Sequence, residues 1–256
     1  MIKSLFFYSF LLTNLVGLSQ VSVEMKKIQG GTFVPLYGSD SSEVVVKDFM
    51  LDVYPVTNEE YLVFVTENEK WRKSKVIKLF ADANYLQQWP NDSVFPTTML
   101  PIAPVTNISW YASKAYCISV GKRLPTIDEW EYVAMASETQ PNAQTDSVFN
   151  QRIIEGYELP KTYAKPVGST FKNYWGIYDM HGLVWEWTSD FNSVMITGES
   201  RQDADADATL FCGGAAVNAT NLMNYAAFMR YAFRGSIKAN YNIRNLGFRC
   251  ASDVVE

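Results

Sequence analysis

The sequence predicts an α+β protein of one domain, with little regular secondary structure and long loops. Helix-capping signals concentrate in the first half, whereas the chain beyond about residue 140 is polar and rich in Gly, Asn, Tyr and Thr, with short β-like pieces such as YAKPVG and LGFRCA. A length of 256 residues with 48% hydrophobic content suffices for one large core. No internal repeat or linker interrupts the chain, so residues 20–256 are assigned to a single domain.

Three helices are predicted from the side chains that can cap them, which are Thr57, Ser109 and Thr126. Glu60 and Glu129 each stand three residues after a capping threonine, so PVTNEEYLVFV and LPTIDEWEYVAMA both contain a capping box. The helix in SWYASKAYCISVGKR is expected to end near Gly121. A further short helix is expected over WRKSKVIKLFAD, residues 71–82.

Residues 1–19 have the pattern of a signal peptide. Lys3 precedes an apolar run, and the small residues Gly17 and Ser19 suit cleavage before Gln20. A retained anchor is the alternative, but the run is shorter than the roughly 20 apolar residues that a spanning helix needs. We therefore expect a periplasmic or secreted protein with no membrane span after cleavage. The net charge of -5 and the lack of a basic run argue against a nucleic-acid partner.

The motif inventory excludes several classes of site. His181 is the only histidine, so a site with three histidine ligands cannot form, and no GxSxG, P-loop or GxGxxG motif precedes a helix. We interpret His181 as a loop histidine satisfied by hydrogen bonds. The stretch DADADAT, residues 203–209, has the alternating aspartates of a calcium loop but lacks its glycine and its final glutamate, so it is interpreted as a solvated acidic loop.

The stretch DMHGLVWEW combines carboxylates with a turn. Asp179 and Glu186 lie seven residues apart, and Gly182 can turn backbone carbonyls inward, which together gives the hard oxygen donors that calcium accepts. Trp185 and Trp187 are interpreted as core anchors. Elsewhere, three cysteines in an exported chain permit one disulfide and leave one thiol over.

Six ordered segments of the chain resemble the sulfatase-modifying-factor family, whose founding activity is formylglycine generation. They are IQGGTFVPL, VYPVTNEEYLVF, PVTNISWYASKAYC, GKRLPTIDEWEY, KPVGSTFKNYWGIYDMHGLVWEWTSDF and NLGFRCA. The resemblance runs from about residue 24 to 252 and implies a C-type-lectin-like fold. The strings LFCGG and YAAFMRYAFR resemble most the NirV-like members that are encoded beside copper nitrite reductases.

This resemblance also implies metal and disulfide positions. Structural calcium would be bound by four residues: Asp179 and Glu186 through side chains, and Gly182 and Val184 through backbone carbonyls. Leu183 departs from the asparagine that is usual in the family. A second calcium site would begin at Asn150, but its partner aspartate is missing from QRIIEGYELPK, so none is predicted there. Cys117 and Cys250 match the disulfide of the family.

The catalytic segment is where the chain departs from the family. Formylglycine-generating enzymes hold copper(I) between two cysteines, because soft thiolates select that ion. Here the matching text is AAFMRYAFRGS, in which Phe228 and Phe233 replace the thiolates while Arg230 and Tyr231 are kept. We therefore predict no catalytic residue and no copper. These four residues, together with Cys212, are the candidates for lining a ligand cleft.

The expected function is that of a non-oxidase accessory or maturation factor that binds a periplasmic client protein or a small ligand. One alternative is a formylglycine-generating oxidase with an altered site that uses Cys212. Another is a binding module with no enzyme client. In a structural interpretation of the same residues, Arg230 only forms a salt bridge and the phenylalanines fill the former metal cavity. The sulfoxide-synthase branch is set aside because its histidines and added domain are missing.

Overall fold

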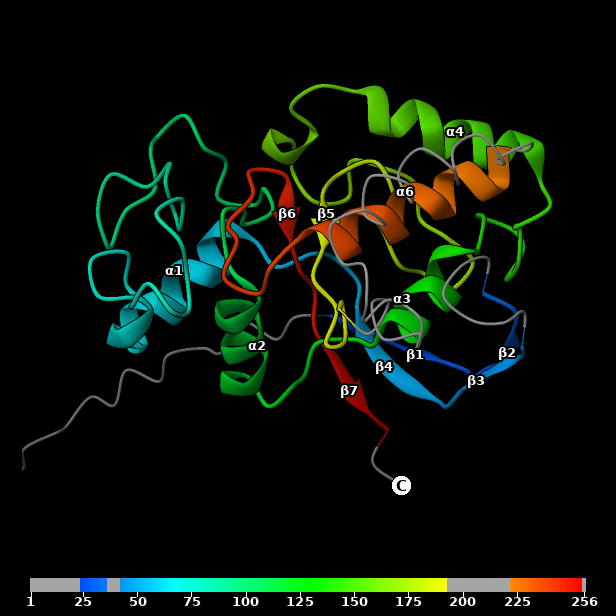
Figure 1. The fold of residues 1–256 in the computed structure, drawn as a ribbon, viewed down its shortest axis with the longest axis horizontal. Coiled ribbons are helices and arrows are strands. Elements are labelled where there is room, and N and C mark those ends of the chain that lie inside the picture. Colours follow the sequence, from blue (N-terminus) through cyan, green and yellow to red (C-terminus); the bar gives the residue numbers. More distant parts are fainter. Residues whose placement is uncertain (1–23, 36–41, 193–221, 255–256) are drawn as a thin grey trace, which may run out of the picture.

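The computed structural model describes residues 24–35, 42–192 and 222–254. Within them the chain has the expected α+β architecture, with a few helices, three small sheets and long connecting loops (Figure 1). The expected signal peptide, the acidic loop at 203–209 and Cys212 lie outside the described residues. No helix among the described residues is long and apolar enough to cross a membrane.

The largest sheet joins strands from the two ends of the domain. Strand β4 (Phe49–Asp52) lies between β1 (Met25–Ile28) and β7 (Ala251–Asp253), and both pairings are antiparallel. Phe49 and Leu51 of β4 are buried, as expected for one face of a strand that packs on a core. The first and last described strands are therefore held by the same central strand.

Two further pairs of strands are short. Strands β2 (Gly31–Phe33) and β3 (Val44–Val46) form an antiparallel ribbon, and β5 (Trp185–Glu186) pairs in parallel with β6 (Leu246–Gly247). In Figure 1 the β5–β6 pair lies in the middle of the molecule, beside one end of helix α6. This pairing brings the segment around residue 185 next to the C-terminal segment, which positions one side of the cavity described below.

The three helices predicted from their caps are present: α1 (Asn58–Glu67), α2 (Trp110–Ser119) and α3 (Ile127–Ala134). Thr57 and Thr126 each form a complete capping box with the glutamate three residues later, and Ser109 accepts a hydrogen bond from the N–H of Ala112. Gly121 follows α2 with a φ of 73°, a left-handed conformation that glycine adopts at little cost. The cap chemistry therefore located all three helix starts correctly.

The helix predicted over residues 71–82 is wrong. The structure has a 3-10 turn, η1 (Glu69–Trp71), followed by irregular turns. Ser74 donates its backbone N–H to one carboxylate oxygen of Asp92 at 2.8 Å and its hydroxyl to the other at 2.5 Å. Because that N–H bonds to a residue 18 positions away, it is not available to an intrahelical ladder.

The second half of the chain contains more helix than the sequence suggested. Helices α4 (Ser147–Glu158) and α6 (Leu222–Ser236) are the longest among the described residues, and they pack against each other (Figure 1). The piece YAKPVG, expected to be β-like, begins instead with the 3-10 turn η2 (Thr162–Ala164). The sequence does contain a helical pattern for α4, since its apolar residues Phe149 and Ile153 are spaced by four positions and both are buried.

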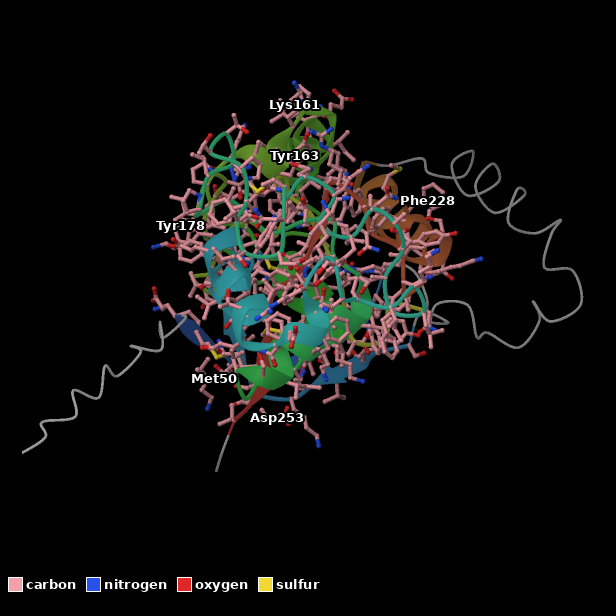
Figure 2. All side chains as sticks on the ribbon, turned by 90° about the vertical axis from the view of Figure 1, so that its left-hand side faces the viewer. Met50, Lys161, Tyr163, Tyr178, Phe228 and Asp253 are labelled. Carbon is pink, nitrogen blue, oxygen red and sulfur yellow. A yellow bond between two sulfur atoms is a disulfide. The ribbon has the colours of Figure 1, made fainter. Side chains whose placement is uncertain are left out.

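The interior is filled by closely packed aromatic and aliphatic side chains (Figure 2). One cluster lies between α1, α2 and the segment around Phe248, and a second lies between the β1–β4–β7 sheet and α3. Cys117 of α2 and Cys250 form the disulfide that the resemblance implies, and both are fully buried in the first cluster. The disulfide joins residues that are 133 positions apart in the sequence.

Candidate binding site

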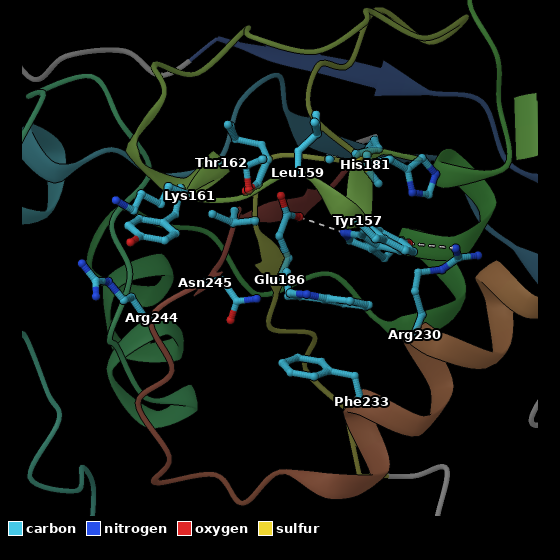
Figure 3. A pocket seen from close by; sticks show the side chains of 18 of the residues that line it. Tyr157, Leu159, Lys161, Thr162, His181, Glu186, Arg230, Phe233, Arg244 and Asn245 are labelled. Atoms are coloured by element: carbon cyan, nitrogen blue, oxygen red, sulfur yellow. Dashed lines mark hydrogen bonds between the residues drawn. The ribbon is translucent and has the colours of Figure 1, made fainter. Parts of the chain in front are cut away.

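A cavity of about 260 Å³ lies where α4, η2, β5 and α6 meet (Figure 3). Its wall is formed by residues far apart in the sequence, among them Tyr157, Lys161, Trp185, Phe233 and Arg244. In Figure 2, Lys161 and Tyr163 lie at the opposite end of the molecule from Met50 and Asp253 of the large sheet. The cavity is therefore separate from the sheet that joins the two ends of the domain.

One wall of this cavity is a stack of aromatic rings. The ring of Trp185 stacks on that of Phe233, with centroids 4.6 Å apart and an interplanar angle of 27°, and on that of Tyr157, at 5.0 Å and 23°. The three side chains are only partly buried, so the stack offers a flat apolar surface to a ligand. Trp185 packs against the core, as expected of a core anchor, and also lines the cavity, whereas Trp187 is fully buried and donates its ring N–H to the carbonyl of Ile108.

Next to the stack, two arginines of α6 converge on one carboxylate of α3. Arg230 donates to Glu131 at 2.8 Å and Arg234 donates to it at 2.6 Å, while Arg230 also donates to the hydroxyl of Tyr157 at 3.3 Å. Burial raises the pKa of Glu131, but the charges of Arg230 and Arg234 outweigh it and lower that pKa to about 2. We call these residues the Glu131 cluster; it carries one surplus positive charge at the cavity wall.

The other end of the cavity carries two cations without an acidic partner. Lys161 and Arg244 are exposed, and neither forms an ion pair with any described residue. The guanidinium of Arg244 lies over the ring of Tyr163, 5.1 Å from its centroid. Figure 3 shows both cations on the same side of the cavity, with Asn245 between them and the aromatic stack. Lys161 has a φ of 55°, where the chain turns from α4 into η2.

The residues predicted to line a ligand cleft divide into two groups. Arg230 and Phe233 lie on the cavity wall, but Phe228 and Tyr231 do not. Phe228 is buried on another side of α6, with 4% of its surface exposed. Cys212 lies outside the described residues. On a helix, neighbouring positions face different directions, which explains why only part of the segment reaches the cavity.

The predicted calcium carboxylates have protein partners in the structure. Both oxygens of Glu186 accept hydrogen bonds from Arg249 at 2.8 Å, and one also accepts from the ring N–H of Trp130 at 2.8 Å. Asp179 accepts from the N–H of Gly168 and from the N–H and hydroxyl of Thr170. Each carboxylate keeps one oxygen that accepts a single bond, so these contacts do not exclude an ion and the calcium site stays a prediction.

The backbone of the same loop also has a structural role. Gly182 has a φ of 83° and lies against Gly156 of α4, where a side chain would meet the opposite backbone. The carbonyl of Leu183 accepts a hydrogen bond from the hydroxyl of Thr162, and Leu183 and Val184 are buried. Among the described residues, no group of three or more His, Cys, Asp or Glu side chains could hold a metal ion. Packing against α4 and η2 thus accounts for this loop.

Two further predictions concern isolated polar residues. The Nε2–H of His181 donates to the carbonyl of Ala134 at 2.7 Å, and burial, reinforced by the charge of Arg230, lowers its pKa to about 3. His181 is therefore neutral near pH 7, and its Nε2 is hydrogen-bonded as expected, whereas its buried Nδ1 has no partner among the described residues. The amide of Asn150 donates to the carbonyls of Gln144 and Asp146 at the start of α4, so it also has a local structural role.

Comparisons with known proteins give a consistent result. The profile of the sulfatase-modifying factor enzyme 1-like domain matches residues 18–254. The chain is 28% identical to the inactive C-alpha-formylglycine-generating enzyme 2 of Bos taurus, over 90% of this chain and 88% of that protein. It is 29% identical to the formylglycine-generating enzyme of the same species, over 82% and 67%. The solved structure of PvdO from Pseudomonas aeruginosa has the same fold, with a TM-score of 0.52 and 18% identity over 90% and 94% of the two chains.

Proposed function

Because the chain belongs to the family of sulfatase-modifying factor enzyme 1-like domains, we propose that it is a non-oxidase member of this family. In this role it binds a client in the periplasm or outside the cell and assists that client's maturation. The cavity between α4, β5 and α6 is the recognition site. The family contains proteins named as formylglycine-generating enzymes and proteins named as inactive ones, so family membership alone leaves both roles open.

The observation that carries the proposal is the stack of Phe233 on Trp185. The resemblance places a copper-binding thiolate at about position 233, and here that position holds a ring 4.6 Å from the neighbouring indole. An aromatic ring supplies neither anionic sulfur nor a lone pair that copper(I) prefers. Phe228, at the other expected thiolate position, is buried away from the cavity. The cavity wall is therefore suited to binding an apolar group.

Oxidation of a peptidyl cysteine tests this directly. The full chain is incubated with a cysteine-containing sulfatase-type peptide, copper(I), oxygen and a thiol reductant, and the peptide is analysed by mass spectrometry. We expect no conversion to formylglycine, whereas the formylglycine-generating enzyme of Bos taurus serves as the positive control. Turnover by the wild-type chain would refute the non-oxidase role.

The alternative is an oxidase that uses Cys212 in an altered site. If the wild-type chain converts the peptide and the Cys212→Ser variant does not, this alternative is supported. If both convert it, the expected positions of the catalytic groups are wrong.

The buried disulfide supports the proposed location. Cys117 and Cys250 lie in the core, and disulfides of this kind persist in oxidising compartments. We propose that residues 1–19 direct export and are removed. Cell fractionation followed by N-terminal sequencing checks both points, and a cytoplasmic protein that begins at Met1 would contradict them.

For the client we propose a copper nitrite reductase, because the strings LFCGG and YAAFMRYAFR resemble the members encoded beside such enzymes. Deleting the gene for this chain should lower the activity or the copper content of the reductase while its abundance stays unchanged. A reductase that is fully active and fully loaded in the deletion strain would contradict this choice of client and leave the recognition site itself untouched.

A further inference from the structure

We propose that the cavity selects a ligand with a carboxylate at one end and a flat apolar body at the other. This inference rests on the cavity being the recognition site proposed above, and it names the chemistry that the site accepts. Such a group can belong to a small aromatic acid or to the C-terminal aromatic residue of a peptide. Both present the same carboxylate beside an apolar body.

The charge of the cavity supports an anionic ligand. Four cations line it: Lys161, Arg230, Arg234 and Arg244. The acidic residue of its lining, Glu186, is neutralised by Arg249, and Glu131, which bonds the two arginines of α6, is not part of the lining. The cavity therefore has a surplus of positive charge in a chain whose net charge is -5. This contrast makes the cavity a preferred site for an anion on this protein.

The donors that would bind the carboxylate are at the open end. Lys161 and Arg244 have no ion pair with a described residue, and the side-chain amide of Asn245 has no hydrogen-bond partner among them. Asn245 points into the cavity in Figure 3, between Arg244 and the stack. A guanidinium, an ammonium and an amide N–H match the acceptor pattern of a carboxylate. The ring of Tyr163 below Arg244 limits the positions that this guanidinium can take.

The apolar end is defined by the stack of Tyr157, Trp185 and Phe233. A flat ring can extend this stack in the same offset geometry, with little loss of conformational freedom. The volume of about 260 Å³ suits one ring with a short acidic arm, because drug-sized ligands usually occupy pockets of about 300 to 1,000 Å³. A whole helix or strand of a partner is too large for it.

Binding to the purified full chain is measured by titration calorimetry with phenylacetate, and with phenylacetamide as its neutral counterpart of similar shape. We expect phenylacetate to bind at least about tenfold more tightly, because opposite charges within a partly enclosed site attract strongly. The preference should decrease as salt is added. A peptide that ends in a free C-terminal phenylalanine, compared with its C-terminal amide, tests the second source of the same group.

The variants identify which side chains carry the preference. In the double variant Lys161→Gln and Arg244→Gln, the preference for phenylacetate over phenylacetamide should fall severalfold, and the surplus charge of the Glu131 cluster should account for what is left. The matched control, Lys78→Gln with Lys165→Gln, removes two exposed lysines that do not line the cavity and should keep the preference. In Phe233→Ala, both compounds should bind more weakly while their ratio is kept.

Equal binding of the two compounds to the wild-type chain, or a preference that is undiminished in the cavity double variant, would overturn the proposal. A client that binds through this cavity without regard to charge would refute the carboxylate preference and leave the recognition site standing. Conversely, copper-dependent oxidation of a cysteine peptide would refute the non-oxidase role and would not alter the measured preference. If the free acid shows the preference and the peptide acid does not, the ligand is a small molecule; the reverse result assigns it to the client.

Discussion

Two clusters of arginine and carboxylate contact Trp130, and they serve different purposes. Glu186 and Arg249 form a closed pair in which Glu186 accepts the ring N–H of Trp130, with side-chain exposures of 1% and 0%. In the other cluster, Arg230 and Arg234 lie over the ring of Trp130 and share Glu131, which keeps 19% of its side chain exposed. The same chemical groups thus give a neutral structural contact in one place and a surplus of charge in the other.

The two clusters differ in whether the donors and charges of their arginines are fully matched by acceptors and counter-charges. Arg249 uses its donors on Glu186 and on the carbonyls of Asp52, Val53 and Tyr178, so none is left for a ligand. In the Glu131 cluster, a single carboxylate is shared by two guanidinium groups, so one positive charge is left without a counter-charge. A fully balanced buried cluster fixes the fold, whereas an unbalanced one at a cavity wall can attract an anion.

Breaking the closed pair should have the largest effect. Glu186→Gln leaves Arg249 buried with its charge uncompensated, so we expect the free energy of unfolding to fall by about 3 to 5 kcal/mol. Chemical denaturation at pH 7 measures this. Lys27→Gln, which removes one partner of an exposed ion pair with Asp48, is the control and should leave stability nearly unchanged. A Glu186→Gln protein as stable as wild type would show that the pair contributes little.

Protonating the Glu131 cluster should have a moderate effect. The pKa of Glu131 is about 2 in the folded protein and 4.5 when the side chain is free in solution. The unfolded chain therefore binds more protons than the folded protein between about pH 2 and 4.5. Stability from this group is complete above about pH 4.5 and is lost as the pH falls toward 2; we expect about 1 to 3 kcal/mol, reduced by solvent contact. The unfolding free energy, measured by chemical denaturation across this pH range, should depend less on pH in Glu131→Gln than in the wild type. An unchanged slope would contradict the lowered pKa.

Asp52, which lies beside the closed pair, should act in the opposite direction. Burial raises its pKa from 3.8 to about 6, although Lys122 at 2.5 Å and the N–H of Cys250 at 3.0 Å lower it. The folded protein then binds more protons than the unfolded chain between about pH 4 and 6, so this group's contribution falls as the pH rises through that window, by about 1 to 3 kcal/mol.

The Asp52→Asn variant isolates the pH-dependent contribution of Asp52 to stability. Its unfolding free energy, measured from pH 4 to 6, should lack the downward slope that Asp52 gives the wild type. If the two proteins have parallel profiles, Asp52 titrates near its ordinary pKa and the ion pair with Lys122 outweighs burial.

Removing calcium should have the smallest effect. Because protein donors already bond to the carboxylates of Asp179 and Glu186, a bound ion would add little, so we expect a chelator to lower the melting temperature only slightly. Differential scanning fluorimetry with added calcium or chelator measures this, and elemental analysis of the purified protein is the companion experiment. A clear loss of stability on chelation would show that the carboxylates bind an ion in place of these donors.

Local chemistry explains which parts of the fold were predictable. Capping depends on residues three positions apart, so Thr57 and Thr126 identified their helices, whereas the turn at Ser74 depends on Asp92, 18 positions away. Lys161 and Arg244 are isolated basic residues in the sequence, and no spacing rule relates them. Only the β5–β6 pairing and the turn after α4 bring them to one cavity.

For the site residues, too, contacts between distant parts of the sequence could not be predicted. Arg230 and Phe233, which the resemblance assigns to a ligand cleft, both line the cavity; the resemblance compares positions and does not require a local pattern. It could not give the partners of Glu186, since the pair with Arg249 spans 63 positions. Carboxylates in a sequence do not reveal whether their counter-charge is a metal or an arginine.

The central position of β4 has a consequence for the time course of synthesis. Asp52 at the end of this strand accepts a hydrogen bond from the N–H of Cys250, 198 positions later, and β7 covers the edge of β4 that β1 leaves open. A growing chain therefore carries an unpaired strand edge until β7 has emerged, and such edges pair readily with other chains. Until then the nascent protein can aggregate through this edge unless it is kept separate from other chains.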